Sequence, residues 1–175
     1  MPRMMSLLAV GAAATLAALS FAVPAQAGAG PFQIRLFGED ASNNTCVSLD
    51  PATGNNPDTQ LRLAACDRTK TNQLWFFDTL GGNDYHIINV SSFNCMRALR
   101  DADRAQVQTI DCTSISDERF SVNVSLPTGA PTQIHARISG GNRCLDATNG
   151  GTSVGTPIQV FHCTSNNGSQ AFSIS

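Results

Sequence analysis

Six cysteines divide most of the chain into three similar units, and this repeat constrains the fold more than any other feature. The first cysteines of the three units recur at an equal spacing, and they are Cys46, Cys95 and Cys144. The second cysteines follow at similar intervals, and they are Cys66, Cys112 and Cys163. After each second cysteine come an acid or amide, one spacer and an aromatic residue: Gln73-Leu74-Trp75, Glu118-Arg119-Phe120 and Gln170-Ala171-Phe172. Three copies of one layout predict a fold with three pseudo-symmetric repeats.

Short strands separated by turn residues account for most of the repeated region. Residues 32–37 and 120–124 alternate between apolar and polar side chains, as half-buried strands do, and residues 85–90 are also strand-like. Clusters of Gly, Asn and Pro at 53–57 and 149–151 indicate turns. The pattern predicts an all-β fold, closed as a barrel so that no long strand edge is exposed.

Each recurrent position of the layout has a physical task in such a barrel. Repeat symmetry favours disulfides within the units, Cys46–Cys66, Cys95–Cys112 and Cys144–Cys163, although six cysteines alone allow other pairings. Each short loop closed in this way contributes about 3 kcal/mol in the chain-entropy model. We expect Trp75, Phe120 and Phe172 to fill the shared core, while the polar residue two positions earlier bonds to backbone groups of the neighbouring turn.

The N-terminus predicts export from the cell. Arg3 precedes an apolar run over 6–23, and Ala25-Gln26-Ala27 has small residues where signal peptidase cleaves. A membrane anchor is the alternative for a run of this length, but small residues ending in Ala-x-Ala favour cleavage. We expect a signal peptide over 1–27 and one secreted domain over 28–175, with repeats at about 30–80, 81–129 and 130–175. The Ala-rich signal and the single lysine are typical of a bacterial extracellular protein.

Charge and motifs argue against several other functions. The chain has a net charge of −2 at pH 7, which gives no basic patch for nucleic acid or for anionic lipid. An even number of cysteines in an exported chain favours disulfides over metal ligands, and the three histidines are scattered. We therefore expect no metal, no cofactor, and no membrane association after signal cleavage. The motifs Gly-x-Ser-x-Gly and His-Glu-x-x-His are absent, so we expect no enzyme.

The repeated Gln-x-Trp pattern with flanking cysteines resembles the ricin B-type lectins and the ricin-type carbohydrate-binding modules of bacterial glycanases. The resemblance covers roughly residues 31–175 and implies a β-trefoil fold. It also implies shallow pockets, one in each repeat, for galactose-like or xylan-type sugars. In this family an Asp two positions after the first cysteine accepts hydrogen bonds from sugar hydroxyls, and an aromatic residue two positions before the second cysteine stacks on the sugar. A Gln two residues before that aromatic and the residue preceding the Gln-x-Trp glutamine supply further contacts.

Only the third repeat keeps these residues. Asp146, Gln159 and Phe161 match the family positions, and Gln170 matches the Gln-x-Trp glutamine. Ser169 stands where the family has Asn, and Asn166 or Asn167 of the same loop can take that role. The resemblance therefore implies a sugar site made by Asp146, Gln159, Phe161, Asn167, Ser169 and Gln170. His162, beside this site, is expected to be an ordinary surface residue.

The first and second repeats lack the main sugar contacts. In the first, Ser48 and Ala64 replace the Asp and the aromatic, although Asn72 and Gln73 remain and Asp50 lies two residues late. In the second, Arg97 and Ile110 occupy the same positions, and Arg97 cannot accept a hydrogen bond. Asp117 and Glu118 replace the Asn-Gln pair there. We expect no sugar binding in either repeat.

Two other functions compete with the lectin interpretation. A secreted peptidase inhibitor or another protein-binding trefoil would use loops that have replaced the lost sugar sites, and the charged loop 97–104 is the first candidate for that contact. This alternative rests on fold analogy. A hydrolase is less favoured, because no acidic pair is marked out by its surroundings.

Overall fold

The computed structural model describes residues 29–37, 44–50, 55–113, 115–138 and 142–175. The predicted signal peptide over 1–27 lies outside the described residues and stays a prediction. The strands are β1 Ala29–Phe32, β2 Ile34–Leu36, β3 Thr45–Leu49, β4 Leu61–Ala65, β5 Trp75–Gly81, β6 Asp84–Asn89, β7 Cys95–Ala98, β8 Ala105–Ile110, β9 Arg119–Val122, β10 Thr128–Thr132, β11 Ile134–Ala136, β12 Arg143–Ala147, β13 Ile158–His162 and β14 Phe172–Ile174. Short 3-10 helices connect them: η1 Thr71–Gln73, η2 Ser116–Glu118, η4 Thr148–Gly150 and η5 Gly168–Gln170.

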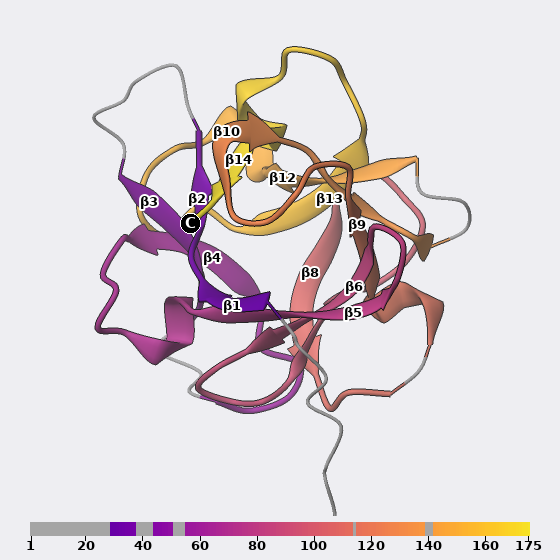
Figure 1. Ribbon diagram of the computed structural model, residues 1–175. Helices are drawn as coiled ribbons and strands as arrows, with labels where there is room; N and C mark the ends of the chain where they lie inside the picture. The colour runs from indigo at the N-terminus through magenta and orange to yellow at the C-terminus, as the bar shows by residue number, and fades with distance from the viewer. Residues whose placement is uncertain (1–28, 38–43, 51–54, 114, 139–141) are drawn as a thin grey trace, which may run out of the picture.

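The strands form a closed all-β structure, as expected from their short, alternating pattern. One sheet runs in the order β1-β5-β6-β7-β8-β13-β12-β11-β9, and β9 also pairs with β6, so that the hydrogen bonding returns to a strand of the same sheet. A smaller sheet has the order β10-β14-β2-β3-β4. Figure 1 shows these strands wrapped around one centre. Closure satisfies backbone groups that an open sheet would leave at its edges.

The two ends of the described chain meet beside one another. β14 pairs antiparallel with β2, and the C-terminus is marked next to β2 and β3 in Figure 1. Beyond these strands, the backbone N–H of Gln33 donates to the backbone carbonyl of Ser175 at 2.8 Å, and the backbone N–H of Ser175 donates to the backbone carbonyl of Gln33 at 3.1 Å. The last strand therefore completes the part of the fold that the first strands begin.

The three predicted disulfides are all present, and each lies at an equivalent place in the strand register. The cysteine pairs are Cys46–Cys66, Cys95–Cys112 and Cys144–Cys163. Each first cysteine lies opposite a residue of the preceding strand, in the pairs Arg35↔Cys46, Ile88↔Cys95 and His135↔Cys144. A disulfide with its first cysteine at the same place in the strand register thus occurs in each of the three units. The boundaries of the repeats stay predictions.

The repeated aromatic residues fill the core, as predicted. Trp75, Phe120 and Phe172 have no exposed surface, and they pack in one cluster with Ile, Leu and Val side chains from most of the strands. The Trp75 indole satisfies its polar group inside this core, because Nε1 donates to the Val47 carbonyl at 3.1 Å. None of the three aromatics is therefore available to stack on a sugar.

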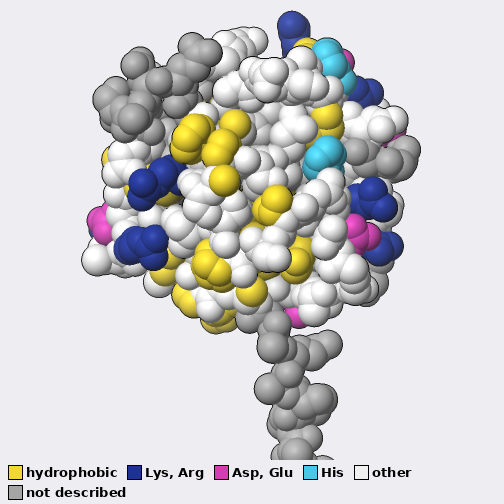
Figure 2. Space-filling model, turned by 45° about the horizontal axis from the view of Figure 1, so that its top comes forward, with side chains coloured by type: hydrophobic (Ala, Val, Ile, Leu, Met, Phe, Trp, Pro, Cys, Tyr) yellow, Lys and Arg dark blue, Asp and Glu magenta, His cyan; other side chains and the backbone are white. Residues whose placement is uncertain are grey.

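Charged side chains lie in small, mixed groups on the face of the molecule that Figure 2 shows. On the face in Figure 2, basic side chains lie at both edges with acidic ones beside them, and they form no continuous basic patch on that face. Among the described residues there is no helix that is long and apolar enough to cross a membrane.

Candidate sugar site

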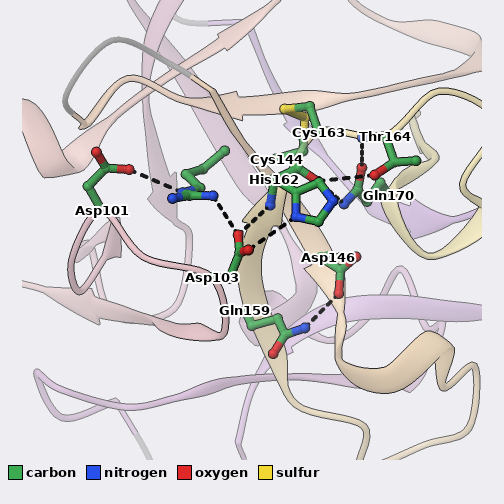
Figure 3. A network of polar contacts seen from close by, with 10 residues as sticks. Asp101, Asp103, Cys144, Asp146, Gln159, His162, Cys163, Thr164 and Gln170 are labelled. Carbon is green, nitrogen blue, oxygen red and sulfur yellow. Dashed lines mark hydrogen bonds and ion pairs between the residues drawn. A yellow bond between two sulfur atoms is a disulfide. The ribbon is translucent and has the colours of Figure 1, made fainter.

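The pairing of β12 with β13 brings three predicted site residues together. Asp146 lies opposite Gln159 in the register, and Phe161 lies opposite Cys144. Gln159 Nε2 donates a hydrogen bond of 2.8 Å to Asp146 Oδ1, as Figure 3 shows. Asp146 is only 4% exposed and Gln159 only 7%. The cross-strand neighbour therefore holds the carboxylate in one orientation.

The start of η5 supplies the partner of the other carboxylate oxygen. Ser169 Oγ lies 2.9 Å from Asp146 Oδ2 and 2.7 Å from Asn167 Oδ1. A hydroxyl has one proton, and of these two oxygens the charged Asp146 carboxylate is the stronger acceptor. Asn167 caps η5, because its Oδ1 accepts the Ser169 backbone N–H at 3.1 Å. This loop therefore places the Ser169 hydroxyl against Asp146.

These side chains line a hollow of about 240 Å³ at the surface. Its lining residues are Arg104, Asp146, Asn149, Gly150, Gln159, Phe161, Asn167 and Ser169. Asn149 and Gly150 form the turn after β12 with φ values of 57° and 70°, a left-handed conformation that Asn and Gly adopt most readily. The hollow thus combines a held carboxylate, amide groups and one aromatic ring.

Gln170 does not line this hollow, although the sequence placed it among the sugar contacts. It is completely buried. Its Oε1 accepts the Thr164 backbone N–H at 2.9 Å, and its Nε2 donates to the His162 carbonyl at 2.9 Å. The side chain therefore closes the turn that follows the third disulfide, and we assign it a structural role in place of sugar contact.

Gln73 and Glu118 close the equivalent turns. Gln73 Oε1 accepts the Asp67 amide at 2.8 Å, and Glu118 Oε2 accepts the Thr113 amide at 2.8 Å. Each bonded amide belongs to the residue directly after a second cysteine. The prediction that this position satisfies backbone groups at the turn is confirmed in all three units.

In the first unit, neutral groups occupy the place of the Asp146–Ser169 contact. Asn72 Nδ2 donates to Ser48 Oγ at 3.0 Å, and Ala64 stands opposite Cys46 where the third unit has Phe161. Asp50 forms an ion pair of 2.8 Å with Arg62. This unit therefore presents neither the held carboxylate nor the aromatic ring.

In the second unit, an ion pair fills the corresponding place, with the cation Arg97 at the position of Asp146. Arg97 Nε lies 2.7 Å from Asp117 Oδ2, and Ile110 lies opposite Cys95. The Arg97 and Asp117 side chains are 23% and 14% exposed, so the pair is largely sheltered from water. A guanidinium paired in this way offers no acceptor for a sugar hydroxyl.

Replacing Asp117 with asparagine is expected to lower the free energy of unfolding by about 1–2 kcal/mol, because it leaves Arg97 sheltered without a counter-charge. Asp117 Oδ1 is buried and receives no hydrogen bond among the described residues. The double variant Arg97→Met with Asp117→Leu should therefore recover most of the loss. Urea denaturation measures both variants. A double variant less stable than Asp117→Asn would contradict this account.

The charged loop 97–104, the first candidate for a protein contact under the alternative function, is held against the third unit. Asp101 and Asp103 form ion pairs with Arg143 of β12, at 3.2 Å and 2.5 Å. Asp103 also accepts the His162 backbone N–H at 2.7 Å, and its other oxygen lies 3.1 Å from His162 Nδ1. Figure 3 shows this network beside Asp146 and Gln159. The acidic side chains of the loop therefore anchor it.

These contacts change the acidity of Asp103. Partial burial raises the pKa of its carboxyl, but the hydrogen bonds from the His162 side chain and backbone, together with the positive charges of Arg143 and His162, outweigh it. The pKa of Asp103 is therefore lower than its usual value of 3.8. A lowered pKa in the folded state means that the charged carboxylate stabilises the fold at pH values above 3.8, and that this contribution disappears as the pH falls through the lowered pKa.

The Asp103→Asn variant is accordingly expected to unfold about 1–3 °C below the unmodified protein at pH 7, a size typical of exposed ion pairs. The difference should shrink towards zero as the pH falls below 3.8. Thermal unfolding followed by circular dichroism between pH 7 and the acid limit measures it. A difference that stays constant over this range would show that the charge of Asp103 is not the cause.

One group of potential metal ligands lies near the third disulfide. His135 Nδ1, Cys144 Sγ and Cys163 Sγ lie within 4.8 Å of one another. Both sulfurs are joined in a disulfide, so neither is a thiolate that could bind a metal ion. These residues therefore do not form a metal site while the disulfide is intact.

Sequence reasoning missed the contributions of Arg104, Asn149 and Gly150 to the hollow. The pair Asn149-Gly150 was visible only as a turn signal. Arg104 belongs to the loop between β7 and β8, and β8 reaches the third unit through its pairing with β13. A long-range pairing of this kind has no local motif that could reveal it.

Comparison with known proteins identifies the family and the fold of the chain. Residues 71–161 match the family described as ricin-type beta-trefoil lectin domain-like, whereas no curated protein sequence matches the chain significantly. Among solved structures, the chain is similar to the designed three-fold symmetric protein ThreeFoil, with a TM-score of 0.70, 16% identity, and coverage of 82% of this chain and 96% of that chain.

Two natural proteins have the same fold. A ricin B-like lectin of Macrolepiota procera, solved in complex with lactose, gives a TM-score of 0.62 at 18% identity and covers 82% of this chain and 93% of that chain. An exo-β-1,3-galactanase of Clostridium thermocellum gives a TM-score of 0.68 at 14% identity. The chain spans 30% of that enzyme, which covers 83% of this chain. At these identities the likeness shows the β-trefoil fold that the sequence predicted.

Proposed function

Because this chain belongs to the ricin-type β-trefoil lectin-like family, we propose that it is a secreted carbohydrate-binding protein whose sugar site is the hollow of the third unit. The observation that carries the proposal is the nearly buried Asp146 carboxylate, held by Gln159 on one oxygen and by Ser169 on the other. A carboxylate held in this way cannot turn away when a ligand arrives, which reduces the entropy lost on binding.

The remaining hydrogen-bonding capacity of the hollow suits adjacent hydroxyl groups. Each Asp146 oxygen has a further lone pair beyond the bond it already accepts, so the carboxylate has room to accept hydrogen bonds from two neighbouring hydroxyls. Gln159 uses its Nε2 for Asp146 and keeps its amide oxygen for the ligand. Phe161 is half-buried and lines the same hollow, where its ring packs against the apolar face of the sugar.

The ligand class that fits is a galactose-like or xylan-type glycan. The similar Macrolepiota procera lectin was solved with lactose, which contains a galactose ring. A hollow of about 240 Å³ holds roughly one sugar ring. Because few atoms are buried in so small a site, we expect a Kd of about 10 μM to 1 mM for a single sugar unit.

The first two units offer no comparable place for a sugar. The pair Ser48–Asn72 is neutral and presents no carboxylate. In the pair Arg97–Asp117, the Asp117 carboxylate is bound to the Arg97 guanidinium. Secretion is part of the proposal because three disulfides require an oxidising compartment to persist, and because the N-terminal sequence has the features of a signal peptide.

A glycan array that includes galactosides and xylo-oligosaccharides tests the proposal. We expect binding to one of these two sets, and loss of that binding in the Asp146→Asn variant. If neither protein binds any glycan at high micromolar concentration, the sugar proposal is wrong, and a search for protein partners of the loop 97–104 becomes the next step.

A further inference from the structure

Arg104 is a cation that the second unit contributes to the sugar site of the third. Its side chain is exposed and lines the same hollow as Asp146 and Phe161. Strands β8 and β13 are antiparallel, and Ala105 lies opposite Val160. Arg104, one residue before Ala105, therefore comes next to Phe161, one residue after Val160. The side chain therefore borders the hollow on the side of Phe161.

The backbone around Arg104 is held in place. The Arg104 amide donates to the Val160 carbonyl at 2.9 Å, and its φ of 64° is in the left-handed region, which is uncommon for a residue with a long side chain. The ion pairs of Asp101 and Asp103 with Arg143 secure the same loop. Observed backbone strain of this kind persists when the surroundings enforce it and is concentrated at functional sites.

The acidic side chains around the hollow have partners, whereas the Arg104 guanidinium has none among the described residues. Asp101 and Asp103 are paired with Arg143, and Asp103 also with His162. Both oxygens of Asp146 are hydrogen-bonded by neutral groups. Within the described part of the chain, by contrast, the Arg104 guanidinium has no hydrogen bond and no ion pair. An Arg side chain always carries its charge and offers a planar set of donors that matches carboxylate and sulfate oxygens.

We propose that Arg104 makes the third-unit site selective for glycans with an anionic substituent, such as a uronic acid carboxylate or a sulfate ester. This inference rests on the proposed sugar-binding function and specifies its ligand. Asp146 repels an anion placed against it, so the ligand orients with its vicinal hydroxyls on Asp146 and its anionic group on Arg104. A neutral sugar of the same shape gains no attraction between opposite charges from the guanidinium.

Isothermal titration with matched ligands tests this selectivity. The ligands are methyl galactoside, methyl galacturonide and galactose 6-sulfate, and the quantity of interest is the ratio of anionic to neutral affinity. We expect a ratio of about three to ten for the unmodified protein, as for a partly exposed ion pair, and a lower ratio at high salt. The ligand with the higher ratio identifies carboxylate or sulfate as the preferred anion.

Arg104→Gln is expected to bring the ratio close to one. Arg100→Gln is the matched control, because Arg100 is an exposed arginine of the same loop that does not line the hollow, and it should keep the original ratio. A ratio of one in the unmodified protein, or a ratio that Arg104→Gln leaves unchanged, would overturn the inference. Failure to bind any of the three sugars, with glycan arrays also silent, would instead overturn the proposed function.

Discussion

Replacing Asp146 with asparagine is expected to lower the affinity for the sugar ligand about 10- to 100-fold. A hydrogen bond between a hydroxyl and a charged carboxylate is worth about 1.5–3 kcal/mol, and the asparagine amide replaces one acceptor oxygen with a donor group. Asparagine has nearly the same shape, and its oxygen can still accept the Gln159 hydrogen bond that Asp146 Oδ1 receives. Isothermal titration of both proteins with the best glycan from the array measures the loss.

The matched control for this variant is Asp50→Asn in the first unit. Asp50 lies two residues beyond Ser48 and is paired with Arg62, so its loss should change the sugar affinity less than about twofold. Circular dichroism of each variant establishes that it is folded. Full affinity in a folded Asp146→Asn protein would exclude the third-unit site, and loss of affinity in Asp50→Asn alone would move the site to the first unit.

Removing the third disulfide by Cys144→Ala with Cys163→Ala is expected to lower the free energy of unfolding by about 3 kcal/mol and the Tm by about 6–12 °C. The two cysteines are 19 residues apart, and the bridge stabilises the protein chiefly by restricting its unfolded chain. Trp75 is the single tryptophan and is completely buried, so its fluorescence reports unfolding in urea.

The second disulfide provides the comparison for this experiment. Cys95 and Cys112 are 17 residues apart, and the entropy of loop closure changes only slowly with loop length. Their removal should therefore cost about the same free energy, to within about 0.5 kcal/mol. If removing either bridge left the free energy of unfolding unchanged, that bridge would not stabilise the protein by restricting its unfolded chain.

The local pattern of the sequence was sufficient for the scaffold. Trp75, Phe120 and Phe172 could be assigned to the core because large aromatics recur at one place in each unit, and their burial is confirmed. The three cysteine pairs followed from the same periodicity, and the structure contains all of them. Repeats are easy to interpret because each unit must bury its apolar face against two copies of itself.

The polar positions needed more than a local pattern. Gln170 matches a family position, yet its side chain bonds within its own turn. Its Oε1 accepts the Thr164 backbone N–H, and its Nε2 donates to the His162 carbonyl. Whether a side chain faces the ligand or the turn depends on which backbone groups lie within hydrogen-bonding distance of it. That distance is set by the packing of η5 against the strands and is not visible in the spacing of residues.

The sequence by itself therefore determined the all-β class, the three units, the core aromatics and the cysteine pairs, because these depend on periodicity and on short-range chain geometry. Only the tertiary structure decided that Asp146 is held from both sides, that Arg97 is neutralised by Asp117, and that Arg104 borders the third-unit hollow. Contacts of this second kind join residues from separate strands and units. These residues become neighbours only in the folded barrel, where burial and low polarity strengthen the contacts between them.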